Sequence, residues 1–298
     1  MVSGADGFLG SRLVQTLASG GAQVFAQVRS KQTLKRLKFL AGFTLLEADL
    51  DHSDLSFLVT QIPAGVDAII HAAAAGVKPG DDDRDRLMAV NVGGTRAMLD
   101  VALKVKARRF VYIGSSFEYG DGNDWKENAE AAPLNVYGES KYMAWQFVQD
   151  YGRMGLNIVG LRPFYMYGEG EASYRLIPSV IAAIKDHMPL DLTAGEQERD
   201  FIYIDDAVRA ILTASIKSSA VGQLLNICSG QPVTIRQAVE ELVKISGKKA
   251  KIRFGAVPYR EKEWMRLSGS PVKAAKLLGF KASIGLSEGL KKALAHAR

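Results

Sequence analysis

Residues 4–10 read GADGFLG, directly after the short apolar run Met1–Ser3 and at the start of the amphipathic segment Phe8–Ser19. Glycines at this spacing allow a tight turn between a strand and a helix, and they let the backbone approach a pyrophosphate closely. The first turn of the helix can then bind the anion. The stretch therefore predicts a dinucleotide-binding turn, with a plain β-α turn as the alternative in a chain of 29 glycines.

Short apolar runs alternate with amphipathic segments over the first two-thirds of the chain, which predicts β-α units around a parallel sheet. The expected strands are Met1–Ser3, Ala22–Arg29, Phe43–Ala48, Ala68–His71, Arg109–Ser115 and Asn157–Arg162. The expected helices are Phe8–Ser19, Leu34–Ala41, Asp54–Gln61, Arg84–Ala107, Tyr137–Met154, Tyr174–Asp186, Asp205–Ser215, Thr234–Ser246, Ser270–Leu278 and Ser287–His296. We expect an α/β fold: a Rossmann-type doubly wound parallel sheet from residues 1–164, with 200–230 returning to it, and a smaller C-terminal α+β substrate lobe from 165–199 and 231–298.

The first expected strand is unusually short. Only Met1, Val2 and Ser3 precede the glycine turn, whereas an average strand has about five or six residues. This strand is central in a doubly wound sheet, so a short one would leave ladder groups of its two neighbours unpaired. We therefore expect the natural protein to begin several residues upstream of Met1.

Composition restricts the class of protein. The chain of 298 residues is 47% hydrophobic and 23% charged, which is ordinary for a globular protein and wrong for a disordered one. A single cysteine, Cys228, forms no internal disulfide, and no apolar stretch is long enough to span a membrane. The net charge of +6 is scattered and suits an anionic small molecule better than nucleic acid. We expect a cytoplasmic protein with no membrane, nucleic-acid or metal partner.

The end of the second expected strand carries basic residues. Arg29, Ser30 and Lys31 stand where an acidic residue would bind the ribose 2′-hydroxyl of NAD. Guanidinium and hydroxyl groups suit a 2′-phosphate, so NADP(H) is favoured and NAD(H) stays possible, with a solvated basic loop as the plain alternative. Asp49, at the end of the third strand, could accept a hydrogen bond from the adenine amino group or cap a turn.

Tyr137 and Lys141 form a Y-x-x-x-K motif on an expected helix, so both side chains leave one face a turn apart. A cationic neighbour favours the phenolate and moves the tyrosine toward a useful acid/base pKa. Ser115 follows a strand that would place it at the C-terminal edge of the sheet, where ligands of such sheets bind.

With these residues the sequence resembles the extended short-chain dehydrogenase/reductase family, whose members mostly act on nucleotide sugars. The resemblance runs almost from end to end. Beyond the segments above, it includes HAAA (71–74), NVGGT (91–95), SS (115–116), LRPF (161–164), YG (167–168), RDFIYIDD (199–206), NICSG (226–230) and PYR (258–260).

The resemblance implies a role for each matched residue. Tyr137 would be the acid/base, Lys141 would tune it and bind the nicotinamide ribose, and Ser115 would hydrogen-bond the reacting sugar oxygen. Further cofactor contacts would come from Gly4, Gly7, Phe8, Leu9, Gly10, Arg29, Ser30, Asp49, Leu50, Ala72, Ala73, Ala74, Asn91 and Pro163. A strand end explains residues 71–74 equally simply, and a bend in the helix explains Asn91. Substrate contacts are implied for Ser116, Tyr165, Arg199 and Arg260, the two arginines lying near the diphosphate.

Two departures from the family narrow the reaction. Ser116 and Phe117 stand where members that eliminate water have an Asp-Glu pair, and Glu118 lies one residue too far along, on the other face of an extended segment. A 4,6-dehydratase is therefore not expected. Tyr165 replaces an asparagine that contacts the substrate phosphate in many relatives, which leaves the diphosphate geometry open.

The activity expected is that of an NADP(H)-dependent reductase of a nucleotide-linked 4-keto-6-deoxy sugar. Besides the basic residues 29–31, a looser similarity around 198–201 and 254–265 to reductases that finish sugars such as paratose and abequose favours it. A 4-epimerase that retains NAD is the alternative enzyme, and a non-catalytic NADP sensor is the alternative from another class. The resemblance also implies a homodimer through the helices Arg84–Ala107 and Tyr137–Met154.

Overall fold

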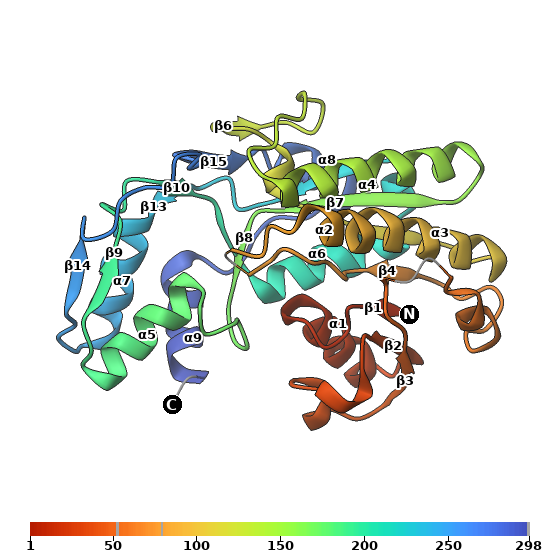
Figure 1. Ribbon diagram of the computed structural model, residues 1–298, viewed down its shortest axis with the longest axis horizontal. Coiled ribbons are helices and arrows are strands. Elements are labelled where there is room, and N and C mark those ends of the chain that lie inside the picture. Colours follow the sequence, from red (N-terminus) through yellow and green to blue (C-terminus); the bar gives the residue numbers. More distant parts are fainter. Residues whose placement is uncertain (52–53, 79, 297–298) are drawn as a thin grey trace. The chain divides into compact units, whose positions relative to one another are not determined.

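The computed structural model describes residues 1–51, 54–78 and 80–296 (Figure 1). Its largest sheet has seven strands in the order β12-β7-β5-β4-β1-β2-β3, which is the doubly wound order. The pairs from β7 to β3 are all parallel, so the predicted α/β fold of Rossmann type is confirmed. These strands are Val2–Ser3 (β1), Val24–Val28 (β2), Phe43–Glu47 (β3), Ile69–His71 (β4), Phe110–Ile113 (β5), Ile158–Pro163 (β7) and Leu224–Ile227 (β12).

Helices pack against this sheet through apolar stripes. α3 (Gly94–Lys104) and α4 (Val136–Arg153) lie side by side (Figure 1). Leu99 and Trp145 from these helices belong to the same buried cluster as Phe110 of β5. Full burial of one such side chain contributes about 1.5–3 kcal/mol, so this cluster stabilises the packing of α3 and α4 on the sheet. The same region contains α1 (Phe8–Ser19), α2 (Arg84–Met88) and most of α6 (Ile204–Ile216).

Two of the expected helices are wrong. Segment 34–41 contains only a 3₁₀ turn, Leu37–Phe39: the N–H groups of Phe39 and Leu40 bond three residues back, and the backbone is already extended at Leu40 (φ -113°, ψ 158°). Segment 54–61 likewise contains a 3₁₀ turn, Ser56–Thr60.

The expected helix Arg84–Ala107 is interrupted. A π turn, Ala89–Gly93, separates α2 from α3, and Asn91 lies inside it, buried. A π turn inserts an extra residue into the helical ladder and redirects the side chains on either side of it. The helix that was expected to be continuous therefore bends at Asn91.

The chain divides into two compact units. Unit 1 comprises Met1–Glu118, Asn135–Arg162 and Val208–Leu225, and unit 2 comprises Tyr119–Leu134, Pro163–Ala207 and Asn226–Arg298. Unit 2 has a four-stranded sheet, β13-β10-β15-β6, and the strand pairs β11-β8 and β14-β9. These strands are Gly122–Trp125 (β6), Tyr165–Tyr167 (β8), Leu190–Leu192 (β9), Glu198–Arg199 (β10), Phe201–Tyr203 (β11), Val233–Thr234 (β13), Ile252–Phe254 (β14) and Arg266–Gly269 (β15). Its helices are α5 (Leu176–Asp186), α7 (Ile235–Ser246), α8 (Val272–Leu278) and α9 (Leu286–His296).

Candidate functional site

The glycine turn packs closely against its neighbours in unit 1. Gly4 has φ +63°, and a Cβ placed there would lie 2.6 Å from the Cα of Ala73. A Cβ at Gly10 would collide with the carbonyl oxygen of Gly4. Gly7 is the N-cap of α1, and Phe8 and Leu9 form the first turn. Gly7 has no side chain to cap that turn, so the N–H groups of the first turn of α1 remain suited to an anion such as a pyrophosphate.

Asp6 fastens the segment after β2 onto this turn. Its carboxylate accepts the N–H groups of Lys35, Arg36 and Leu37 at 2.7, 2.7 and 2.8 Å. The Arg36 guanidinium donates back to the carbonyl oxygen of Asp6 at 3.2 Å. Sequence reasoning did not single out Asp6, although a carboxylate inside a glycine turn is a ready acceptor for neighbouring N–H groups.

The end of β2 lies beside the same turn. The N–H of Ala5 donates to the carbonyl of Gln27 at 2.9 Å, and the Gln27 side chain accepts from the N–H of Gly4 at 3.0 Å. Arg29 follows two residues later and is exposed. The Ser30 hydroxyl accepts from the N–H of Gln32 at 3.2 Å and so caps a 3₁₀ turn. Segment 29–36, which begins with Arg29 and ends with Arg36, therefore adjoins the glycine turn.

Further candidates for cofactor contact follow β3 and β4 in unit 1. The Asp49 carboxylate accepts the N–H of Asp51 at 3.2 Å, which is the turn-capping arrangement. Leu50 is buried, and a Cβ at Gly94 would lie 2.9 Å from its carbonyl oxygen. Ala72, Ala73 and Ala74 follow β4 and are half-buried, with Ala73 against Gly4.

Asn91 links two segments of unit 1. Its side-chain oxygen accepts the N–H of Ala75 at 2.8 Å, and its amide nitrogen donates to the carbonyl of Ala75 at 3.1 Å. The same nitrogen donates to the Ser140 hydroxyl at 2.8 Å, between Tyr137 and Lys141 on α4. The bend at Asn91 thus ties the segment after β4 to the helix that carries the acid/base motif.

His71 is buried and neutral, and its two ring nitrogens link the strands β4 and β1 to the helix α3. The Thr95 hydroxyl donates to the Asn91 carbonyl at 2.6 Å, so Nε2 of His71 must donate to Thr95 Oγ1, 3.0 Å away. Nδ1 then accepts from the Ser3 hydroxyl at 2.7 Å. Burial, with a further contribution from Lys141, lowers the pKa of His71 to about 3. The side chain is therefore uncharged at neutral pH.

Ser115, Tyr137 and Lys141 all belong to unit 1. Ser115 lies buried just after β5, and its Oγ accepts the N–H of Phe117 at 3.2 Å. The Asn135 side chain caps α4 by accepting the N–H of Gly138 at 2.8 Å, which places Tyr137 in the first helical turn. The Tyr137 ring is half-buried and meets the Phe117 ring edge-on at 6.3 Å.

Lys141 is a buried cation on the same helix. Its Nζ lies 4.5 Å from the centre of the Tyr112 ring, and only 2% of the residue is exposed. Burial lowers its pKa to about 8, and the nearby Glu118 carboxylate acts in the opposite direction. A phenol with a cation one helical turn away is an arrangement suited to general acid/base chemistry.

Glu118 and Arg162 form a buried ion pair that sequence reasoning missed. Arg162 Nη2 lies 2.7 Å and Nε 2.8 Å from the same carboxylate oxygen, with side-chain exposures of 2% and 1%. The other oxygen accepts the N–H of Ser115 at 2.7 Å. Glu118 was considered only as a possible elimination carboxylate. The signal was Arg162 inside the buried apolar strand β7, because such a cation needs a buried partner.

The substrate residues expected in unit 2 lie in different environments. Arg199 is buried, donating to the Glu263 carboxylate at 2.7 Å and to the Glu198 carbonyl at 2.8 Å. Burial lowers its pKa despite the adjacent carboxylate. Arg260 is exposed. Tyr165 is half-buried under the Arg175 guanidinium, whose carbon lies 4.8 Å from the ring centre.

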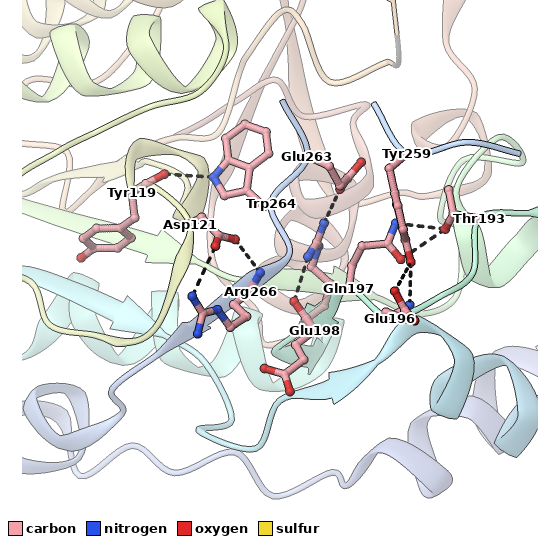
Figure 2. Close-up of polar contacts among 11 residues, drawn as sticks. Tyr119, Asp121, Thr193, Glu196, Gln197, Glu198, Tyr259, Glu263, Trp264 and Arg266 are labelled. Carbon is pink, nitrogen blue, oxygen red and sulfur yellow. Dashed lines mark hydrogen bonds and ion pairs between the residues drawn. The ribbon is translucent and has the colours of Figure 1, made fainter. Parts of the chain in front are cut away.

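Segment 258–264 is tethered at both ends within unit 2 (Figure 2). The Tyr259 hydroxyl accepts the N–H of Glu196 at 3.1 Å, and the Trp264 indole N–H donates to the Tyr119 carbonyl at 3.1 Å. Glu263 therefore bonds to Arg199 from a segment that is fixed at both ends.

Two candidates remain: Ser116 is buried in a 3₁₀ turn of unit 1, and Pro163 is the last residue of β7.

Within residues 1–51, 54–78 and 80–296, no three His, Cys, Asp or Glu side chains gather in a way that could hold a metal ion. Over the same residues, none of the helices combines the length and the apolar character needed to cross a membrane.

Known proteins match this chain over nearly its whole length. The uncharacterized UDP-glucose epimerase YtcB of Bacillus subtilis (strain 168) is 28% identical over 99% of this chain and 96% of its own. The CDP-abequose synthase of Salmonella muenchen is 26% identical over 99% and 96%. The UDP-glucuronic acid 4-epimerase of Bacillus cereus, solved with UDP-glucuronic acid and NAD, superposes with a TM-score of 0.88 at 26% identity over 99% and 97%.

A family model gives the assignment. The model described as the NAD dependent epimerase/dehydratase family matches residues 1–228, which include the glycine turn, Ser115, Tyr137 and Lys141. The chain therefore belongs to the NAD dependent epimerase/dehydratase family, enzymes of the extended short-chain dehydrogenase/reductase type.

Proposed function

We propose that the protein is an NADP(H)-dependent reductase of a nucleotide-linked 4-keto-6-deoxy sugar. The observation that carries this proposal is the basic segment after β2. Arg29 is exposed where NAD binding favours a carboxylate, and Arg36 is fastened to the glycine turn through Asp6. Guanidinium groups form strong, charge-assisted hydrogen bonds to phosphate, so this surface suits the 2′-phosphate of NADP(H).

The acid/base residues then have distinct tasks. NADPH, when bound, supplies the hydride for the carbonyl carbon. Tyr137 donates its phenolic proton to the carbonyl oxygen as that oxygen becomes a hydroxyl, and Ser115 hydrogen-bonds the same oxygen. The Lys141 ammonium stabilises the resulting phenolate by its charge. Arg199 and Arg260 would bind the diphosphate of the substrate, with Ser116 and Tyr165 as further substrate contacts.

The setting of Glu118 supports reduction over elimination of water. An elimination needs a carboxyl group that can give a proton to the leaving hydroxyl. Glu118 instead accepts hydrogen bonds from Ser115 N–H and from Arg162 on its two oxygens, at 2.7–2.8 Å. Ser116 and Phe117 supply no carboxyl group at the positions where dehydratases have one.

A 4-epimerase that retains NAD is the second candidate. It is favoured by the UDP-glucuronic acid 4-epimerase, which was solved with NAD bound, and by the epimerase name of the Bacillus subtilis relative. Reduction followed by release of oxidised cofactor is favoured by the CDP-abequose synthase relative and by the basic segment.

The deciding experiment measures which dinucleotide the purified protein holds and how fast it exchanges. Denaturation of an aliquot releases any bound cofactor for identification, and fluorescence titration then gives Kd for NADPH and NADH. We expect exchangeable NADPH with at least about tenfold preference over NADH, because loss of one phosphate–arginine contact is worth about 1.4 kcal/mol or more. Arg29→Ala should remove most of this preference, whereas Lys104→Ala, at the far end of α3, should not. Stoichiometric NAD that survives purification would overturn the proposal in favour of the epimerase.

We also propose a homodimer through α3 and α4. Met98, Leu99, Val101, Ala102 and Ala144 are buried within unit 1 and so belong to its core. The exposed apolar group left for a partner on these helices is Met143, 39% exposed, next to the half-buried Phe147. Multi-angle light scattering at micromolar concentration should give the mass of a dimer, and Met143→Glu should shift it toward the monomer.

A further inference from the structure

Glu118 folds back onto the residue that precedes its own 3₁₀ turn. Its N–H donates to the Ser115 carbonyl at 3.2 Å, while its carboxylate accepts the Ser115 N–H at 2.7 Å. Both main-chain polar groups of Ser115 are thus bonded to one residue. This ring fixes the backbone at the position from which the Ser115 hydroxyl must reach the sugar oxygen.

Arg162 holds the carboxylate from the neighbouring strand. The pair is buried on both sides, and its second oxygen receives two guanidinium hydrogen bonds from the end of β7. Gly114 makes room for it, since a Cβ there would collide with Glu118 Oε1 and lie 3.3 Å from the Leu161 carbonyl oxygen. The surrounding backbone therefore leaves this carboxylate a single placement.

The pair lies within a group of buried titratable side chains in unit 1. Burial lowers the pKa of Lys141 and raises that of Tyr112; the charge of Glu118 opposes the first shift and, with Tyr137, adds to the second, which Arg162 opposes. The Tyr112 hydroxyl donates to the Lys141 carbonyl at 2.8 Å, which holds the strand against the helix. His71 is neutral and contributes no charge. Glu118 is therefore the anion that faces the two buried cations, Lys141 and Arg162.

We propose that Glu118 is a positioning residue of the reaction: its carboxylate fixes the backbone of Ser115 and balances the positive charge of Lys141 and Arg162. The proposal rests on the proposed function for the roles of Ser115 and Lys141. Glu118 does not touch the reacting atoms, because its two oxygens are occupied by Ser115 and Arg162. Its removal should change the pH at which Lys141 loses its proton as well as the rate.

The first variant is Glu118→Gln, which keeps an acceptor oxygen for Ser115 and removes the charge. With the anion gone, the protonated form of Lys141 is less favoured, so its titration midpoint moves to lower pH. We expect a shift of about one pH unit, the lower end of the effect of one nearby charge. The readout is NMR of ¹³Cε-labelled lysine in the full chain without substrate, with the Lys141 signal assigned from Lys141→Met.

Three further variants separate charge from structure. Glu118→Gln/Arg162→Gln removes both charges and should return the midpoint toward that of the wild type. Glu118→Asp keeps the charge but shortens the reach to Ser115, so kcat should fall with little change in pH dependence. Glu139 lies on the same helix as Lys141 and pairs with Arg84 of α2 in an ion pair in which the side chains of Arg84 and Glu139 are 57% and 35% exposed. Glu139→Gln removes this pair and should leave the titration midpoint of Lys141 unchanged.

In a steady-state assay, the basic limb of kcat should move to lower pH in Glu118→Gln, with Kd for NADPH within about threefold of the wild type. An unchanged Lys141 midpoint in a folded Glu118→Gln would overturn the proposal, even if the variant melts earlier. The NMR titration needs no substrate, so it still decides the role of Glu118 if the wild type proves not to be a reductase. Absence of 4-keto reduction by the wild type would refute only the proposed function.

Discussion

Two glutamate–arginine pairs have the same N···O distance of 2.7 Å but different surroundings. In unit 1, Glu118 and Arg162 have side-chain exposures of 1% and 2%, and the carboxylate also binds a backbone N–H. In unit 2, Arg199 and Glu263 have exposures of 7% and 16%, and Glu263 comes from a segment between two tethers. Ion pairs of equal length can therefore serve different purposes.

Burial decides the difference. A fully buried pair has already lost its hydration, so removal of one partner leaves a charge with no alternative solvent. The Arg199–Glu263 pair is less completely buried, since 16% of the Glu263 side chain remains exposed, so removal of one partner should cost less. We expect the Glu118–Arg162 pair to stabilise the structure around Ser115, and Arg199 of the second pair to bind an anionic ligand.

Breaking the buried pair should have the largest effect. Glu118→Ala should lower the free energy of unfolding by about 3–5 kcal/mol, because Arg162 would keep an uncompensated buried charge. Urea denaturation followed by circular dichroism measures it, with Glu139→Ala on α4 as the exposed control. A loss below about 1 kcal/mol, as for an exposed pair, would refute the contrast between the two pairs.

His71 is a buried group that carries no charge at neutral pH, and it can be compared with the buried ion pair. The pKa of His71 in the folded chain is about 3, below the value of 6.5 for an unperturbed histidine, so the unfolded chain binds more protons between these values. Stability conferred by neutral His71 is complete above pH 6.5 and falls as the pH drops toward 3. Between pH 6.5 and 5, the wild type should lose about 2 kcal/mol more than His71→Gln, measured by urea denaturation at each pH. Parallel losses in both proteins would contradict a neutral His71.

The more accessible pair should show its role in ligand binding. Arg199→Gln should weaken binding of UDP, the probe for a nucleoside diphosphate, by about tenfold in calorimetric titration, since one charge-assisted contact is worth at least about 1.4 kcal/mol. Arg266→Gln is the control, because Arg266 pairs with Asp121 at 3.8 Å in an exposed setting next to Arg199's strand. Equal affinities for UDP in the two variants would remove Arg199 from the ligand site.

The fold was largely predictable because its signals are local. The glycine turn, the apolar periodicity of each strand and helix and the Y-x-x-x-K spacing can each be read within one short segment. Segment 34–41 shows where this fails: its sequence permits a helix, but it forms a single 3₁₀ turn, which lies against Asp6, about thirty residues earlier, through the N–H groups of Lys35 and Leu37. The interruption at Asn91 has the same origin, since its amide bonds to Ala75 and Ser140 on other segments.

In the candidate site, too, the features that depend on one short segment could be predicted, and those that depend on distant residues could not. Tyr137 and Lys141 share a helical face by spacing alone, and the basic residues after β2 can be read directly from the sequence. Glu118 did not stand out, because its meaning depends on Arg162, which lies 44 residues further along the chain. Arg199 was expected as a substrate residue, yet its present partner is Glu263, 64 residues away.

The sequence by itself determined the parallel α/β sheet, the glycine turn between β1 and α1 and the shared helical face of Tyr137 and Lys141, because each depends on periodicity or on a motif within one short segment. Only the tertiary structure decided which charges are buried, which are paired and which remain accessible. Burial and pairing are set by residues far apart in the chain, and the free energy of a charge depends on the solvent that it has lost.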